Sequence, residues 1–234
     1  MGDARANPSG GPSGDPGATL AFLQDELEAI YGVTAPRVAD FLMGGEAARA
    51  VGREPSAPEE LLVLEEEGGL ALGLYLDDEV LRAAGAADPH HRRPRLVTRG
   101  ALRPLACAAE GVSHFVYLST RAAEGRPVSL LELEVQAEVD KFALLVLHLW
   151  RRGLRRMSRA LRGRLFERVR FQAHLDLDAL SRYREANRLG GGYARWLEGR
   201  YVEDADADGL LRELRRSYRL GAAEKFGYLG ARGH

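Results

Sequence analysis

The sequence predicts an α+β protein that is mostly α, with a small N-terminal β-hairpin or sheet packed on a helical body. Residues 61–76 contain two apolar runs around an acidic Gly-Gly turn, a pattern typical of a β-hairpin. From residue 104 onward, apolar side chains recur every three or four positions, which is the period of amphipathic helices. We therefore expect the hairpin to precede a helical body over residues 104–229.

The composition indicates one globular domain without a membrane span. Residues 1–17, rich in Gly and Pro, are expected to be a disordered leader before a single domain over 18–234. The longest apolar run, 142–150, falls far short of the about 20 residues that a transmembrane helix needs. With a net charge of -1 and Cys107 as the only cysteine, we expect a cytoplasmic protein without disulfides.

Periodicity and helix signals place the remaining elements. An amphipathic pattern predicts a helix over 18–31, and the carboxylates of 77–79 favour the first turn of another. Pro104 suits a first helical position, and Ser129-Leu-Leu-Glu132 matches a capping box. The expected helices are 18–31, a short one near 38–53, 104–123, 129–150, 155–172, 177–203 with a break at 190–192, 208–218 and a terminal turn near 222–229.

Two of these helices carry polar side chains at metal-ligand spacing. Glu110 and His114 are four residues apart, so they share one face of the first helix. On the next helix, Glu138 lies within the run Gln136-Ala-Glu-Val-Asp140. Carboxylates and an imidazole at such spacing can bind one metal ion, so Glu110, His114 and Glu138 are candidate ligands of a divalent, zinc-like metal.

The same side chains also have a simpler interpretation, in which no cofactor is bound. Glu110 and His114 would belong to a solvated helix face that also carries Arg121. On the next helix, ordinary i,i+3 and i,i+4 pairs would form among Glu134, Glu138 and Lys141. The sequence leaves both interpretations open.

The segment from Leu61 to Ala143 resembles the gluzincin-type zinc peptidases. In that family a strand edge precedes a helix with an HExxH motif, and a later helix supplies a Glu in an ExxxD or ExxAN pattern. Here a hairpin pattern precedes EGVSH and then QAEVDKFA, which is similar to the E-x-E-A-N-x-F-A run of one bacterial branch. The resemblance implies a zincin-like fold in which two His and a Glu hold zinc and the HExxH Glu activates water.

The departures from the family pattern fall on the positions that carry its chemistry. His114 matches the second His, but Glu110 stands in place of the first His and Gln136 in place of the Glu ligand. Gly111 occupies the position of the catalytic Glu and has no side chain that could act as a base. The resemblance therefore implies a peptidase fold that has lost peptidase chemistry.

Residues 151–170 form a strongly basic segment with nine Arg and one Glu. If the segment is helical, its apolar residues leave five Arg toward water, which we call the arginine stripe: Arg152, Arg155, Arg156, Arg159 and Arg162. The stripe is a candidate site for phosphates, nucleic acid or an acidic protein surface. The alternative is a solvated face in a chain whose basic residues are almost all Arg.

The sequence leaves three functions in contention. The leading one is a non-catalytic interaction or regulatory protein on a degenerate zincin-like helical core, with another protein as its partner and no bound metal. The second is a metal-dependent hydrolase in which Glu110 and His114 face a pocket together with Glu134, Glu138 or Asp140. The third is a polyanion or nucleic-acid binder that acts through the arginine stripe.

Overall fold

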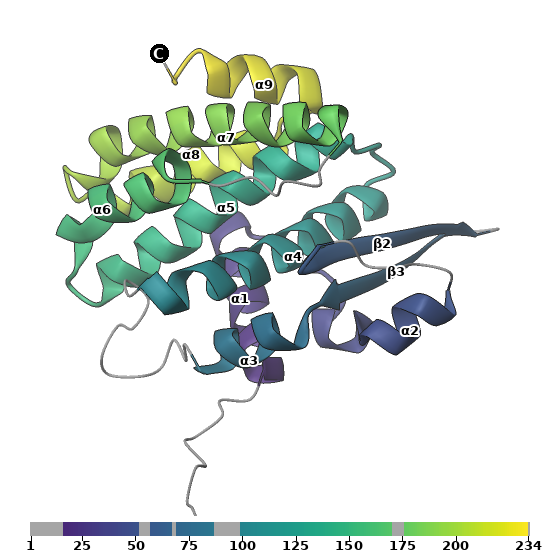
Figure 1. Cartoon of the computed structure of the whole chain (residues 1–234). Helices are drawn as coiled ribbons and strands as arrows, with labels where there is room; N and C mark the ends of the chain where they lie inside the picture. The colour runs from purple at the N-terminus through teal and green to yellow at the C-terminus, as the bar shows by residue number, and fades with distance from the viewer. Residues whose placement is uncertain (1–15, 52–56, 67–68, 87–98, 170–175, 234) are drawn as a thin grey trace, which may run out of the picture.

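The chain is α+β and mostly α, as its sequence predicts, with 75% of the structure helical beside one three-stranded sheet (Figure 1). The computed structural model describes residues 16–51, 57–66, 69–86, 99–169 and 176–233. The leader expected over 1–17 lies almost wholly outside these ranges. The elements are α1 (Pro16–Tyr31), η1 (Val38–Phe41), β1 (Leu42–Met43), α2 (Gly45–Ala50), β2 (Glu59–Glu66), β3 (Gly69–Leu76), α3 (Asp78–Ala86), α4 (Arg99–Ala123), α5 (Leu130–Arg151), η3 (Arg155–Met157), α6 (Ser158–Arg162), η4 (Gly163–Glu167), α7 (Leu177–Leu197), η5 (Glu198–Val202), α8 (Ala207–Arg219) and α9 (Ala222–Gly230).

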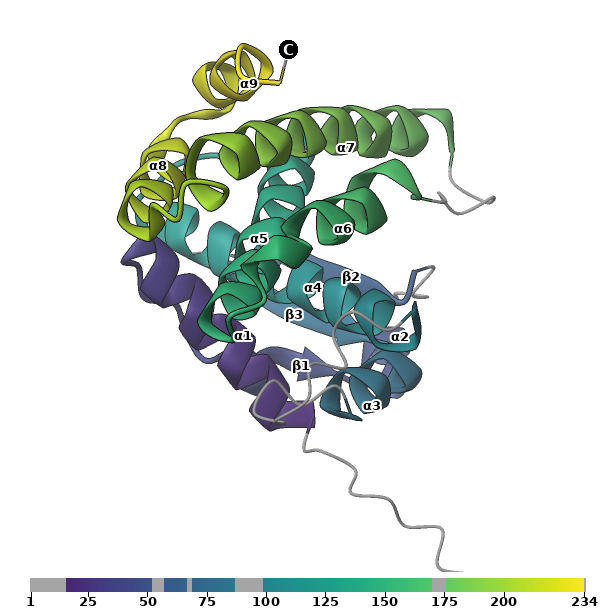
Figure 2. The same cartoon turned by 90° about the vertical axis from the view of Figure 1, so that its left-hand side faces the viewer.

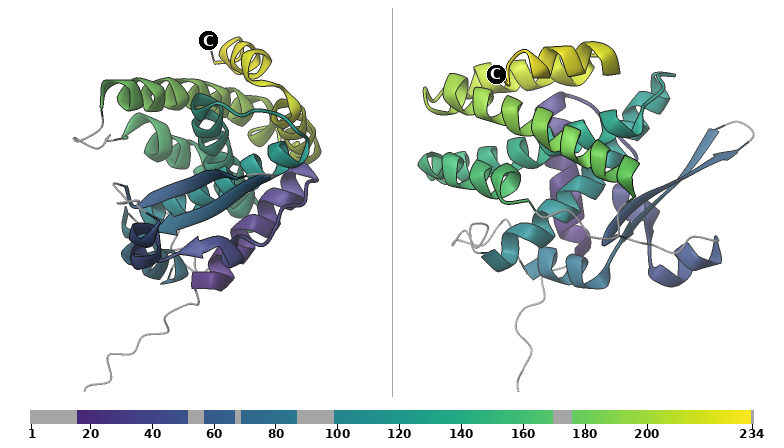
Figure 3. Two further views of the ribbon diagram at one scale, coloured as in Figure 1. Left: turned by 90° about the vertical axis from the view of Figure 1, so that its right-hand side faces the viewer. Right: turned by 45° about the horizontal axis from the view of Figure 1, so that its top comes forward.

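The expected β-hairpin is confirmed. Strands β2 and β3 pair antiparallel from Glu59 opposite Leu76 to Glu66 opposite Gly69, and the hairpin reaches out beyond the helices (Figure 3, right). No pattern in the sequence indicates β1, which pairs parallel with β3 on its other side and completes the order β1-β3-β2. A strand of two residues is too short to produce an alternating pattern, and this one lies inside the helix expected near 38–53.

The helices stack in layers on one face of the sheet. Helix α4 packs against β2 and β3, α5 packs against α4, and α7 packs against α5. Helix α1 crosses this stack and contacts α4, α5 and α8 (Figure 2). Helix α5 lies at the centre, and its apolar second half is buried on every side, as a helix without a polar face should be. Both faces of α4 and α5 are consequently covered.

Helix α4 begins earlier than the sequence predicts. Pro104 was expected at the first helical position, but the helix starts at Arg99 and Pro104 lies inside it. A proline removes one backbone hydrogen bond and is tolerated within a helix only where other contacts offset the loss. The helix is anchored on both sides of Pro104 by Leu102 and Leu105, whose side chains are buried in the core.

The N-terminus of α5 forms as expected, but only half of the capping box is present. The Ser129 hydroxyl accepts a hydrogen bond of 3.2 Å from the Glu132 backbone N–H. The Glu132 carboxylate does not return to Ser129, and instead it accepts a hydrogen bond of 2.5 Å from the Tyr117 hydroxyl. The start signal is therefore confirmed, and its acidic residue is used to join α5 to α4.

The break expected at 190–192 is absent, because α7 runs without interruption to Leu197. The three glycines instead allow close packing. A Cβ at Gly190 would lie 2.5 Å from the Cβ of Glu138, and one at Gly192 would lie 2.8 Å from the Cα of Gly233. Glycine at these positions lets α7 approach α5 and the C-terminal segment, which sequence periodicity alone does not reveal.

The single helix expected over 155–172 is divided where the structure describes it. It consists of a 3-10 turn, the short helix α6 and a π turn that ends at Glu167. Changes between helix types rotate successive side chains onto different faces, so the segment does not present one continuous surface. In the described parts of the chain, no helix is both long and apolar enough to cross a membrane.

Candidate functional site

His114 lies in a buried cluster between α4, α5 and β2. Its side chain is only 8% exposed, with Nδ1 3.2 Å from Glu59 Oε1 and Nε2 3.6 Å from Glu134 Oε2. Glu59 begins β2, and Glu134 lies in the second turn of α5. The interpretation of this helix face as solvated is therefore wrong for His114, and likewise for Arg121, whose side chain is 2% exposed. The sheet and the neighbouring helices cover that face.

Lys141 occupies the other half of the cluster. Its Nζ lies 3.0 Å from Glu110 Oε2 and 3.2 Å from Glu138 Oε1. The second contact is the i,i+3 pair that the sequence predicts, and the first joins α5 to α4. Burial alone would lower the pKa of Lys141, but the charges of the two carboxylates outweigh it and raise that pKa. Lys141 is thus a cation that is held inside the protein by two acids.

Four carboxyl groups in the cluster face two buried cations. We call this group the carboxylate cluster: Glu59, Glu110, His114, Glu134, Glu138 and Lys141. Arg182 of α7 adds a more distant positive charge, with Nε 4.0 Å from Glu134 Oε1. Carboxylates outnumber the two enclosed cations by two, so the interior of the cluster retains an excess of negative potential.

The protonation equilibria reflect this imbalance. Burial raises the pKa of Glu59 and of Glu138, although each has a cation beside it. Burial acts in the same sense on Glu110, but Lys141 and then His114 lower its pKa below the usual value. Burial lowers the pKa of His114, but the nearby carboxylates of Glu59 and Glu134 raise it well above the usual value. Of Glu59, Glu110 and Glu138, Glu110 is therefore the acid whose ionised form is favoured most.

The atoms that could hold a metal differ in part from the expected set. Among the described residues, Glu110, His114 and Glu134 each offer one ligand atom, all within 4.8 Å of one another. Glu138, expected as the third ligand, turns to Lys141 instead. Asp140 lies in a different environment, where it accepts hydrogen bonds from Tyr31 and, at 2.6 Å, from the Ser113 hydroxyl. The group of atoms that lie close enough to hold one ion thus includes Glu110 and His114 of the expected set, with Glu134 in place of Glu138.

Gly111 lies directly beneath the sheet. A Cβ at this position would be 2.9 Å from Glu59 Cγ and 3.0 Å from Leu74 Cδ1. These separations are tighter than ordinary side-chain contacts, so with any larger residue the side chains of Glu59 and Leu74 would have to shift. The space that a residue 111 side chain would occupy is consequently filled by the protein itself.

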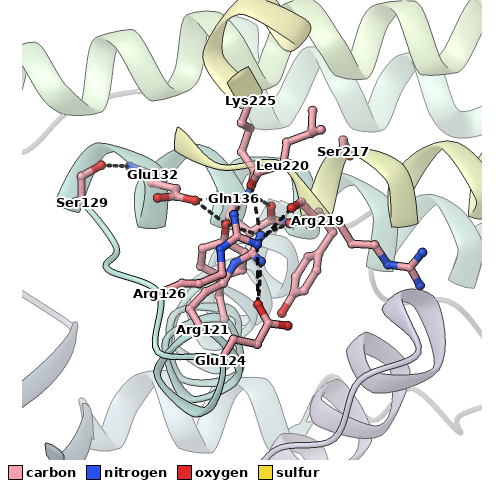
Figure 4. Close-up of polar contacts among 12 residues, drawn as sticks. Arg121, Glu124, Arg126, Ser129, Glu132, Gln136, Ser217, Arg219, Leu220 and Lys225 are labelled. Atoms are coloured by element: carbon pink, nitrogen blue, oxygen red, sulfur yellow. Dashed lines mark hydrogen bonds and ion pairs between the residues drawn. The ribbon is translucent and has the colours of Figure 1, made fainter. Parts of the chain in front are cut away.

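Gln136 belongs to a second buried network, which α9 completes (Figure 4). Lys225 of α9 donates a hydrogen bond of 2.7 Å to Gln136 Oε1 and another of 2.6 Å to the Tyr117 hydroxyl. Gln136 in turn donates one of 2.7 Å to Asp140 Oδ1. Position 136, which the resemblance aligns with a zinc ligand, is therefore directed away from His114 and toward the C-terminal helix.

Lys225 is the member of this network that sequence reasoning missed. It is 1% exposed, and burial lowers its pKa to about 7 even though the charge of Glu132 opposes the shift. Arg121 hydrogen-bonds the same Tyr117 hydroxyl at 3.0 Å and the Leu220 carbonyl at 3.1 Å (Figure 4). A lysine in a short terminal turn carries no sequence signal for burial, because its environment comes from distant helices.

The arginine stripe is not a continuous surface. Arg162 is buried, and it hydrogen-bonds Glu198 at 2.8 Å and Glu167 at 2.6 Å. Arg155 donates to the backbone carbonyl of Val202 and, at 2.6 Å, to that of the next residue. Of the five predicted residues, Arg156 and Arg159 are exposed. The expectation that all five face water is therefore wrong, because the helix is divided and two of its arginines join it to η5.

Comparisons of the chain with protein-family models, with curated proteins and with solved structures find no match. The protein is therefore classified here by its fold and by the geometry of its buried cluster. It is a mostly helical α+β protein whose two central helices enclose a carboxylate cluster against the edge of a small sheet.

Proposed function

We propose that this chain is a non-catalytic interaction or regulatory protein built on a degenerate zincin-like helical core. The observation that carries the proposal is the packing of Glu59 and Leu74 onto Gly111. A hydrolase of the resembled family needs a carboxylate at position 111 and open space for a substrate above it. Here that position has no side chain, and the sheet fills the space.

The rest of the cluster agrees with a loss of hydrolytic chemistry. Lys141 neutralises Glu110, which stands where the resembled family has its first zinc-binding His. Gln136, in the position of the Glu ligand, is engaged by Lys225. Each of these side chains has a stabilising partner within the protein, so the residues of the former active site act as parts of the core.

A surface on α7 supports the interaction role. A shallow depression of about 440 Å³ lies on the first half of this helix, and it is lined by Leu177, Leu180, Ser181, Arg184, Glu185 and Arg188. Leu177 is 84% exposed, so its apolar side chain is open to contact by a partner at this depression. Its combination with exposed Arg184 suits a partner protein that offers an apolar side chain and a carboxylate, whereas Arg188 is already paired with Glu185.

The interaction is tested by changing Leu177 alone. Partner proteins purified with the wild-type chain are compared by quantitative mass spectrometry with those purified with Leu177→Asp. Leu130→Asp is the matched control, because Leu130 is also exposed (61%) but begins α5, outside the α7 depression. We expect one partner in stoichiometric amount with the wild type and with the control, reduced at least about tenfold by Leu177→Asp, as for a central apolar contact. Equal recovery with all three chains would reject α7 as the binding surface.

A further inference from the structure

Three side-chain atoms of the carboxylate cluster lie close enough together to hold one metal ion, and such an ion need not take part in catalysis. We infer that Glu110, His114 and Glu134 bind one divalent transition-metal cation, with Glu59 orienting the imidazole. This inference is independent of the proposed function, because a metal can be held in the interior without activating water. The leading hypothesis from the sequence combines the loss of catalysis with the absence of a metal. The present inference differs from it, because here a metal is bound although catalysis is lost.

The orientation of His114 carries the inference. Its Nδ1 lies 3.2 Å from a carboxylate oxygen of Glu59, which holds the proton on that nitrogen and leaves Nε2 to act as a ligand. Nε2 is buried and has no hydrogen-bond partner among the described residues. It is directed toward Glu134, whose nearer oxygen is 3.6 Å away. In metal-binding histidines, one ring nitrogen typically donates its hydrogen to a carboxylate while the other binds the metal together with further ligands. His114 has this arrangement, with Glu59 at Nδ1 and Glu134 near Nε2.

The size of the site suits a small cation. The three ligand atoms lie within 4.8 Å of one another, and ligands at 2.0–2.2 Å from zinc are separated by about 3.4 Å in a tetrahedral site. Closure therefore requires each side chain to move by less than about 1 Å. One imidazole and two carboxylates favour Zn²⁺ or Mn²⁺ over Ca²⁺ and Mg²⁺, which prefer oxygen ligands alone.

Charge supports the same conclusion. A histidine that ligates a metal is neutral, so the four carboxyl groups of the cluster would face only one enclosed cation, Lys141, and a divalent ion would supply positive charge that the cluster otherwise lacks. Lys141 Nζ lies 3.0 Å from Glu110 Oε2 and thus competes with the metal for this ligand. Glu110 is the most exposed of the three ligands, since 22% of its side chain is exposed against 8% for His114 and 10% for Glu134.

The inference is tested first on the wild-type full-length chain. Zn²⁺ is titrated into metal-free protein by isothermal calorimetry, and metal content after dialysis is measured by mass spectrometry. We expect one ion per chain with a dissociation constant on the order of micromolar or below. Histidine labelled with ¹⁵N provides a second measurement on the wild type, because ligation shifts the Nε2 resonance of one buried histidine. No saturable binding below about 1 mM would overturn the site.

Single substitutions identify the ligands. We expect His114→Gln and Glu134→Gln each to weaken Zn²⁺ binding by at least about 100-fold, and Glu59→Gln to weaken it about tenfold, as loss of an orienting partner does. Glu138→Gln is the matched control on the same helix and should change the affinity far less than Glu134→Gln. Lys141→Met removes the competitor for Glu110 and should tighten binding. Equal effects at 134 and 138 would overturn the assigned ligand set.

The outcomes remain informative if a variant fails to fold. Each variant is checked by its thermal unfolding transition, and the wild-type titration with its Nε2 shift stands without any substitution. Absence of Zn²⁺ binding would reject the metal site and leave the proposed non-catalytic function intact. Zinc-dependent peptide hydrolysis would instead contradict the proposed function while agreeing with the metal site. The two proposals therefore fail separately.

Discussion

Glu59 of β2 lies against Gly111 of α4, so closely that a Cβ on the glycine would be 2.9 Å from Glu59 Cγ. This contact joins the sheet to the helix at the position where the resembled peptidases carry their general base. It also directs the Glu59 carboxylate toward Nδ1 of His114, 3.2 Å away. The same approach that excludes a side chain at position 111 therefore fixes the orientation of the histidine one turn later.

The close approach at Gly111 predicts an unusual response to Gly→Ala substitution. Alanine in a helix interior ordinarily stabilises by up to about 1 kcal/mol relative to glycine. Gly111→Ala should instead lower the free energy of unfolding by about 1–3 kcal/mol, because the new methyl group overpacks the contact with Glu59 and Leu74. Gly227→Ala in α9 is the control, since nothing lies within 4 Å of its Cβ. Guanidinium unfolding that shows the same sign for both variants would contradict the packing described.

Lys141 should be important for stability, because its removal leaves two buried carboxylates without a cation. We expect Lys141→Met to lower the free energy of unfolding at pH 7 by about 3 kcal/mol, the scale of an unpaired buried charge. Glu110→Gln in the same chain should recover part of that loss. A double-mutant cycle in urea measures the coupling between the two residues. Additive effects would mean that the 3.0 Å contact contributes nothing.

Lys225 predicts a rise in stability with pH. Its pKa is about 7 in the folded protein and about 10.4 in an unfolded chain. Between these values the unfolded chain binds a proton that the native state has released, so the free energy of unfolding increases as the pH rises from 7 to 9. Lys225→Met should remove this increase. Denaturant unfolding across that range tests it, and an unchanged slope in the variant would show that Lys225 does not titrate there.

The divided arginine stripe predicts unequal effects within one basic segment. Arg162→Ala should destabilise by about 3 kcal/mol, since it leaves the buried carboxylate of Glu198 without its 2.8 Å partner. Arg156→Ala should change stability by no more than about 0.5 kcal/mol, because Arg156 is exposed. Thermal unfolding of the two variants gives the comparison. Similar shifts would indicate that the segment is a uniform solvated face.

The sequence predicted those parts of the fold that local patterns determine. The hairpin follows from two short apolar runs, and Ser129 starts α5 as its capping signal indicates. The spacing of Glu110 and His114 correctly placed both on one face of α4, toward α5. What local patterns could not determine is the rotation of α5. Its buried half has no polar stripe, so nothing in the sequence distinguished Glu134 from Glu138 as the neighbour of His114.

Other features were missed because they arise from long-range packing. Glu59 lies 55 residues before His114, and only the docking of β2 on α4 brings them together. The glycines at 190–192 read as a helix break, yet they are needed for close contact with Glu138 and Gly233. Lys225 is buried by helices that precede it by about a hundred residues. In each case the decisive partner is distant in sequence, so periodicity and capping rules carry no information about it.

We propose that the core of this protein is a degenerate zincin-like arrangement without peptidase chemistry. The most direct measurement is hydrolysis of a fluorogenic protein substrate by the Zn²⁺-saturated wild-type chain, with His114→Ala prepared in parallel. We expect the same background rate for both chains, because position 111 beneath Glu59 is a glycine and carries no carboxylate base. Turnover by the wild type that disappears in His114→Ala would contradict the proposal.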